Sequence, residues 1–178
     1  MKIAEKGVVL YKGEVQNFPV HMAPTQKLGV LFGNPARLVM SDATNLYDIS
    51  IKDVLGQIGF ASPIKEAIMP WQPTKEEIIS LVDVGIISDV ILFTTVNAYR
   101  FEEQLAVLKS LREWCPNKRI IAVATRSPMD APYLAKYADE VIVTGGITEN
   151  TFLALMNNLF GSGAFYSHQP LTYLQPAE

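Results

Sequence analysis

Three short apolar runs that alternate with helical patterns constrain the fold of this chain more than any other feature. The runs are Val90–Thr95, Arg119–Thr125 and Glu140–Thr144, and they are rich in Val, Ile and Thr. Because their apolar residues follow one another almost without polar alternation, they are typical of strands buried on both faces of a sheet. Strand, helix and strand repeated in one direction form a parallel sheet with right-handed crossovers. The sequence therefore predicts a parallel α/β core over this part of the chain.

Two segments in this part have the spacing of helices with one apolar face. The first lies between the first two runs, and its apolar face is made of Phe101, Leu105, Leu108 and Leu111 or Trp114. The second extends from Thr148 to Phe160, and its apolar face is made of Phe152, Leu155, Met156 and Leu159. Upstream, Thr74 and Glu77 form a capping box, which predicts the start of another helix.

The N-terminal half adds further elements to the predicted sheet and its covering helices. Strands are expected at Lys27–Phe32 and Ile64–Met69, a helix at Ser50–Ile58, and a short extended piece at residues 7–12. The chain is thus predicted to be a three-layer α/β sandwich with a mostly parallel sheet of about five or six strands. This is the Rossmann or flavodoxin-like class of fold.

The whole chain, residues 1–178, is expected to form one α/β domain, because no linker or internal repeat divides it. Residues 27–161 would make up the α/β core, and residues 1–26 form a segment that leads into it. In the tail, residues 162–178, the stretch Leu171–Leu174 could add an edge strand.

Composition excludes several classes of protein. With 49% hydrophobic and 19% charged residues, the chain is globular rather than disordered. The net charge of −3, with acids and bases interspersed, argues against nucleic acid as a partner because phosphate binding needs a basic stripe. No apolar run reaches the roughly 18 to 20 residues of a membrane span, and the N-terminus lacks the features of a secretory signal. The single cysteine excludes an internal disulfide, and we expect a cytoplasmic protein.

Motifs that bind cofactors or metals are missing from the sequence. It has no G-x-G-x-x-G or P-loop motif, no hydroxyl-rich flavin phosphate loop and no G-x-S-x-G elbow. His21 and His168 lie in proline-flanked loops without metal-ligand spacing, so we interpret them as exposed loop residues rather than as a base or a metal pair. Cys115 is interpreted as a small residue at a helix end. We therefore predict no cofactor, no metal site and no self-contained active site.

The loops that follow the three runs are the expected working surface, because the carboxyl ends of parallel strands lie at one edge of a sheet. The loops TVNAYR, TRSPMD and TGGIT supply the candidate substrate or interdomain contacts, which are Asn97, Tyr99, Arg100, Arg126, Ser127 and Asp130. A structural interpretation is favoured for the second loop: its Ser-Pro pair starts a turn, and Asp130 caps a short helix, Ala131–Tyr137. Arg126 could still hold a carboxylate or close an interdomain salt bridge.

A set of short segments resembles a known family. The segments are IAEKGVVLYK at 3–12, TTVNAYRFEEQ at 94–104, RSPMD at 126–130, TGGITENTFLALMNNLFG at 144–161 and QPLTYL at 169–174. In this order they are similar to the C-terminal α/β domain of family 3 glycoside hydrolases, and most like that of two-domain bacterial β-N-acetylhexosaminidases. The chain departs from the family pattern at Ser127, Met129 and Gly145–Ile147.

The resemblance implies a domain that contributes no catalytic residue. In the family the nucleophilic aspartate, a K-H-F-P-G-H segment and an Asp–His acid/base loop belong to an N-terminal barrel, and this sequence contains none of them. Residues 1–26 would then be the linker segment from the missing barrel, and the chain would pack on that barrel in cis or in trans. The parent enzyme would remove N-acetylglucosamine from cell-wall or chitin-type sugars.

Two alternatives to an accessory domain stay open. One is a stand-alone module that lost the catalytic domain and binds a sugar or a small anion, or self-associates as a homo-oligomer. Loss of a barrel would expose an apolar face, which drives association. The other is an independent enzyme of flavodoxin-like fold, which rests on fold analogy alone and ranks lowest.

Overall fold

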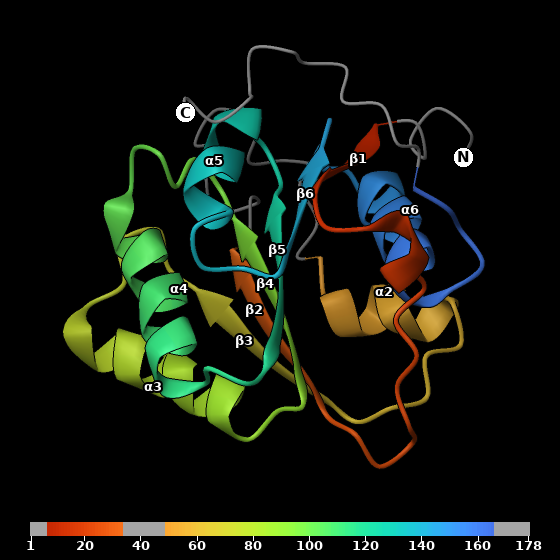
Figure 1. Ribbon diagram of the computed structural model, residues 1–178, viewed down its shortest axis with the longest axis horizontal. Helices are drawn as coiled ribbons and strands as arrows, with labels where there is room; N and C mark the ends of the chain where they lie inside the picture. Colours follow the sequence, from red (N-terminus) through yellow and green to blue (C-terminus); the bar gives the residue numbers. More distant parts are fainter. Residues whose placement is uncertain (1–6, 34–48, 166–178) are drawn as a thin grey trace.

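The computed structural model of the chain describes residues 7–33 and 49–165. In these residues one six-stranded sheet has the strand order β1-β6-β5-β4-β2-β3 (Figure 1). The strands are β1 Val8–Lys12, β2 Leu28–Gly33, β3 Ile64–Met69, β4 Val90–Thr95, β5 Arg119–Ala124 and β6 Glu140–Thr144. The helices are η1 Val15–Asn17, α2 Ile51–Gln57, α3 Lys75–Ile86, α4 Glu102–Trp114, η3 Pro128–Asp130, α5 Ala131–Leu134 and α6 Glu149–Phe160.

Helices cover both faces of the sheet. Figure 1 shows α2 and α6 on one side and α3, α4 and α5 on the other, and each group packs with its own set of strand side chains. Successive residues of one strand enter opposite cores, as Leu92 and Phe93 of β4 do. Strand β1 pairs antiparallel with β6, and the other neighbouring strands are parallel. The predicted three-layer α/β sandwich with a mostly parallel sheet is confirmed.

Local sequence signals predicted most elements at the correct residues. Val90–Thr95 and Glu140–Thr144 are strands in which every residue is buried, which explains their near-continuous apolar runs. Thr74 and Glu77 form the predicted capping box of α3. Thr148 caps α6, and the apolar face predicted for that helix is buried.

The buried face of α4 differs from the prediction. Its buried residues are Gln104, Val107, Leu108 and Leu111. Leu105 is half-buried and packs against this core, and of the alternatives Leu111 and Trp114 the first is buried whereas Trp114 is 72% exposed. Gln104 points inward because its side-chain amide bonds to the backbone of Val96. Leu105 lies opposite α5, which has 4 residues and is too short to cover the 13-residue helix α4.

Other predictions near helix ends and at the chain termini have mixed outcomes. The helix predicted at Ala131–Tyr137 ends at Leu134. Cys115 is buried at the C-cap of α4, and this burial raises the pKa of its thiol, as expected for an inert helix-end residue. The edge strand predicted at Leu171–Leu174, together with His168, lies outside the described residues.

None of the helices in the described ranges is both long and apolar enough to span a membrane.

One buried amide on α6 has no hydrogen-bond partner in the described part of the chain. The Nδ2 and Oδ1 atoms of Asn158 are unpaired, although the side chain is fully buried. Leaving such a group unpaired costs about 1–3 kcal/mol, so an apolar side chain of similar shape is preferred there. We expect Asn158→Leu to raise the free energy of unfolding by about 1 kcal/mol, measured from denaturant unfolding curves.

The neighbouring residue supplies a matched control for this prediction. The Oδ1 atom of Asn157 accepts a hydrogen bond from the Ser162 amide at 3.2 Å. Asn157→Leu removes a satisfied bond and is therefore expected to lower stability. Equal losses of stability for Asn157→Leu and Asn158→Leu would contradict the assignment of Asn158 as an unpaired group.

Candidate functional site at the strand-end edge

The strand order places the loop after β4 beside the point where open α/β sheets have ligand crevices, and the loop after β5 is its neighbour. The chain passes from β2 to the edge strand β3 and then to β4 on the other side of β2, so the direction of strand addition reverses beside β4. Ligands of such sheets bind outside the carboxyl ends of the strands at this reversal. Because β4, β5 and β6 are parallel, the loops after them lie at one edge, as the sequence predicts.

The loops after β4 and β5 are joined by the side chain of Asp130. Its Oδ2 atom accepts a hydrogen bond from the Thr95 hydroxyl at 2.8 Å, and its Oδ1 atom accepts one from the Tyr99 amide at 3.0 Å. Thr95 ends β4 and Tyr99 lies in the loop beyond it, whereas Asp130 ends η3 after β5. The carboxyl group is fully buried, and we call this arrangement the Asp130 clamp. It fixes two neighbouring strand-end loops to each other.

This contact corrects the predicted role of Asp130 as a helix cap, because its side chain makes no capping bond to α5. Ser127 caps η3 instead: its hydroxyl accepts a hydrogen bond from the Met129 amide at 3.3 Å, which confirms the predicted Ser-Pro turn. Asp130 points inward because buried backbone amides of the loop after β4 need acceptors, and the carboxyl group supplies them.

Burial raises the pKa of the Asp130 carboxyl group, and hydrogen bonds from the Ala98 amide, the Tyr99 amide and the Thr95 hydroxyl oppose this shift. The folded state therefore binds the proton more tightly than the unfolded state. This group's contribution to stability is full below the unfolded pKa of about 3.9 and falls as the pH rises through the folded pKa. Its oxygens face donors of the protein itself, so the geometry is that of a structural clamp rather than a general acid.

Buried threonines at the ends of three strands continue this hydrogen-bond network. The Thr125 hydroxyl donates to the Thr95 carbonyl at 2.6 Å. The Thr144 hydroxyl lies 2.7 Å from the Thr125 carbonyl and 3.0 Å from the Gly146 carbonyl. These residues were not predicted from the sequence, although a threonine at the end of each apolar run was a visible signal. The polar groups at the strand ends are thus bonded to one another.

Gln104 is a second positioning residue that the sequence analysis missed. Its Oε1 atom accepts a hydrogen bond from the Val96 amide at 3.0 Å, and its Nε2 atom donates to the carbonyls of Val96 at 3.0 Å and Trp71 at 3.3 Å. The side chain is 1% exposed and ties the loop after β4 to the segment after β3. Its burial could have been predicted from its spacing, because Gln104 lies on the same face of the helix as Leu108 and Leu111.

The remaining predicted contact residues divide into a turn residue and exposed cations. Asn97 has φ +55°, in the left-handed region that asparagine tolerates, and its carbonyl accepts hydrogen bonds from the amides of Arg100 and Phe101. Arg100 and Arg126 are both exposed, and the Arg100 guanidinium lies 5.3 Å from the centroid of the Tyr99 ring. The structure therefore brings Tyr99 and Asp130 together and leaves both arginines available at the surface.

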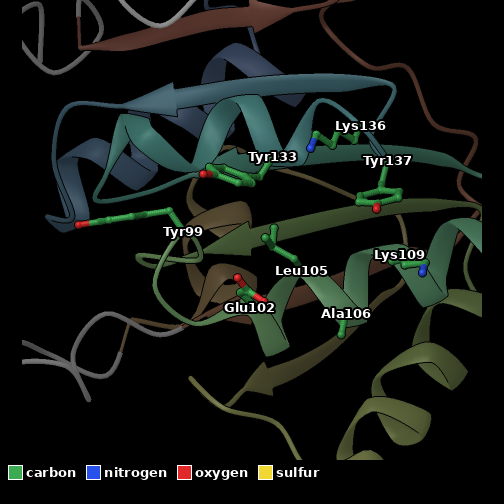
Figure 2. A pocket seen from close by; sticks show the side chains of 8 residues that line it. All are labelled: Tyr99, Glu102, Leu105, Ala106, Lys109, Tyr133, Lys136 and Tyr137. Atoms are coloured by element: carbon green, nitrogen blue, oxygen red, sulfur yellow. The ribbon is translucent and has the colours of Figure 1, made fainter. Parts of the chain in front are cut away.

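A groove of about 320 Å³ lies between α4 and α5 (Figure 2). Tyr99, whose backbone amide donates to Asp130 in the clamp, lines this groove. One wall comes from α5 and the turn after it, and the other comes from α4 and the loop before it. Its lining combines aromatic, apolar and charged side chains, chiefly Tyr99, Tyr133, Tyr137, Leu105, Glu102 and Lys136. Of these residues, only Tyr99 was predicted from the sequence as a candidate substrate or interdomain contact. In the described ranges, no group of three or more His, Cys, Asp and Glu residues could hold a metal ion.

Solved structures similar to this chain include glycosidases. A family 3 β-N-acetylglucosaminidase from a Paenibacillus species matches with a TM-score of 0.74 and 20% identity, over 92% of this chain and 30% of that chain. A fungal multi-domain family 3 β-N-acetylglucosaminidase matches with a TM-score of 0.69 and 14% identity, over 94% of this chain and 18% of that chain. A β-glucosidase from Listeria innocua matches with a TM-score of 0.66 and 12% identity, over 90% of this chain and 24% of that chain.

Comparisons of sequence give no relative, since neither the protein-family models nor the curated proteins include a match. This chain spans less than a third of the length of each of the three glycosidases described above. At identities of 20% or less, the likeness is one of fold. The described residues therefore share their fold with one part of family 3 glycoside hydrolases.

Proposed function

We propose that this chain is the noncatalytic C-terminal domain of a family 3 glycoside hydrolase and packs on a catalytic barrel, in cis or in trans. The proposed parent activity is that of a β-N-acetylhexosaminidase acting on N-acetylglucosamine-type sugars. The observation that carries the proposal is the match to the Paenibacillus enzyme, which covers 92% of this chain but 30% of that one. The larger part of that glycosidase has no counterpart in this chain, which is the relation expected of an accessory domain.

The strand-end edge supports a contact role rather than a catalytic one. The buried carboxyl group there is engaged by the Thr95 hydroxyl and the Tyr99 amide, so it has no free face toward a substrate. Arg100 and Arg126 are exposed and lie in the loops after β4 and β5 at the same edge. An arginine at an interface forms charge-assisted, often bidentate bonds with carboxylates, and in this proposal the barrel supplies those carboxylates.

Association with a barrel tests this proposal directly. A catalytic barrel from the same source, expressed separately, is expected to co-elute with this chain in size-exclusion chromatography. Arg126→Ala is expected to weaken the association roughly tenfold by calorimetry, because an interfacial charge-assisted bond is lost.

Lys118→Ala serves as the matched control, since this lysine lies next to the start of β5, at the opposite edge of the sheet. It is expected to leave the affinity unchanged. Absence of any complex would contradict the accessory-domain proposal, whereas equal affinities of the Arg126→Ala variant and the original chain would remove only that loop from the interface.

A further inference from the structure

We propose that the groove between α4 and α5 binds one ring of a neutral saccharide. This site lies outside the contacts assigned to the barrel, and it rests on the proposed function only for the choice of sugar. The inference is carried by the residues that line the groove, their exposure and the way the Asp130 clamp holds its two walls.

The groove offers aromatic and apolar surface suited to the C–H faces of a sugar ring. Tyr133 is 43% exposed on the α5 wall, and Tyr137 lies in the turn that follows α5. Figure 2 shows Tyr133 on one side of the groove, with Leu105 and Glu102 on the other. Amphipathic tyrosine rings present an apolar face together with a hydroxyl group that donates and accepts hydrogen bonds. The lining can therefore contact both the apolar face and the hydroxyl rim of a pyranose.

The charged side chains around the groove are of both signs. The Glu102 carboxylate accepts hydrogen bonds, and the ammonium groups of Lys109 and Lys136 donate them. A sugar hydroxyl both donates and accepts, so a lining of mixed sign suits a polyol. A phosphate or a cation would instead need charges of one sign. The volume of about 320 Å³ is at the small end of the range for ligand pockets, which fits one ring rather than a long segment.

The two walls of the groove are held by the same carboxyl group. Asp130 accepts a hydrogen bond from the Tyr99 amide at 3.0 Å. This bond fixes the loop that carries Tyr99, which lines the α4 side of the groove. Asp130 also directly precedes α5, which carries Tyr133. The tyrosines are thus positioned before any ligand arrives, and this preorganisation reduces the entropy lost on binding.

The test is a nuclear magnetic resonance titration of the isotopically labelled full chain with tri-N-acetylchitotriose and, separately, with cellotriose. We expect saturable shifts of amides in α4 and α5, with a dissociation constant on the order of 1 mM for at least one sugar. Tyr133→Ala should weaken binding at least about tenfold, whereas Tyr133→Phe, which keeps the ring, should retain most of it.

Trp114→Ala is the matched control, because this exposed aromatic residue lies on α4 but does not line the groove. It should leave binding unchanged. Absence of shifts with both sugars would overturn the proposal, as would binding that survives Tyr133→Ala, or shifts that depend on protein concentration alone and so report a second copy. Because no barrel is present in this titration, its failure is distinguishable from failure of the accessory-domain proposal.

Discussion

Asp130→Ala is expected to lower the free energy of unfolding by about 3 kcal/mol. The substitution leaves the Thr95 hydroxyl and the Tyr99 amide buried without their acceptor. Each unpaired buried group costs about 1–3 kcal/mol, and the total is reduced because a buried carboxyl group is also removed. Urea unfolding followed by circular dichroism measures the change.

Asp130→Asn separates the hydrogen bonds from the charge. The amide oxygen can still accept a hydrogen bond from Tyr99, so we expect a loss of about 1 kcal/mol or less. Because the pKa of Asp130 is raised in the folded state, the original chain loses stability as the pH rises above about 4 through the folded pKa. The Asn variant should lack this part of the pH dependence.

Asp89→Ala provides the control for burial. Asp89 also accepts a backbone amide, that of Lys27 at 2.7 Å, but it is exposed to solvent. Water can replace the lost acceptor there, so a loss below about 1 kcal/mol is expected. If Asp130→Ala and Asp89→Ala had equal effects, or if Asp130→Asn kept the full pH dependence, the Asp130 clamp would be contradicted.

Arg119→Ala is expected to have a comparable effect at the opposite edge of the sheet, again about 3 kcal/mol. The Arg119 guanidinium bonds to both carboxylate oxygens of Glu140, at 2.8 Å and 3.2 Å, and to the Asn17 carbonyl at 3.2 Å. Glu140 is 4% exposed, so loss of the guanidinium leaves a buried carboxylate with the side-chain Nδ2 atom of Asn17 as its remaining described partner. Breaking one side of a buried ion pair costs about 3–5 kcal/mol, and the partial exposure of Arg119 favours the lower value.

A second substitution tests the origin of this loss. Adding Glu140→Gln to Arg119→Ala removes the unpaired charge, so the double variant should be more stable than Arg119→Ala alone. Lys109→Ala is the exposed control: Lys109 lies 3.9 Å from Glu113, both side chains are well exposed, and a change below about 0.5 kcal/mol is expected. A double variant less stable than Arg119→Ala would contradict the assignment of the loss to a buried charge.

The sequence predicted those parts of the fold that local physics determines. The runs at Val90–Thr95 and Glu140–Thr144 are buried strands. Their β-branched residues favour strands over helices, and their lack of polar residues indicates burial on both faces. The hydroxyl groups of Thr74 and Thr148 cap helices at the predicted residues because capping depends on neighbours within one turn. The antiparallel pairing of β1 with β6 was not predicted, because it joins residues more than 120 positions apart.

Polar residues with distant partners were predicted less well. The loops after β4 and β5 lie at one edge of the sheet as predicted, and Tyr99 and Asp130 meet there, but Asp130 was expected to cap a helix. Its partner Thr95 is 35 residues away in the sequence. Local sequence patterns do not predict contacts between residues so far apart. The groove was missed for a similar reason, since Leu105 has the spacing of a core residue and is left half-buried opposite the short helix α5.

The accessory-domain proposal is tested most directly by hydrolysis of a chromogenic N-acetyl-β-glucosaminide. The substrate is given to this chain alone, to a catalytic barrel from the same source alone, and to the mixture of the two. The account predicts no hydrolysis by this chain and faster hydrolysis by the mixture than by the barrel alone. Hydrolysis by this chain alone, or equal rates for the barrel and the mixture, would contradict it.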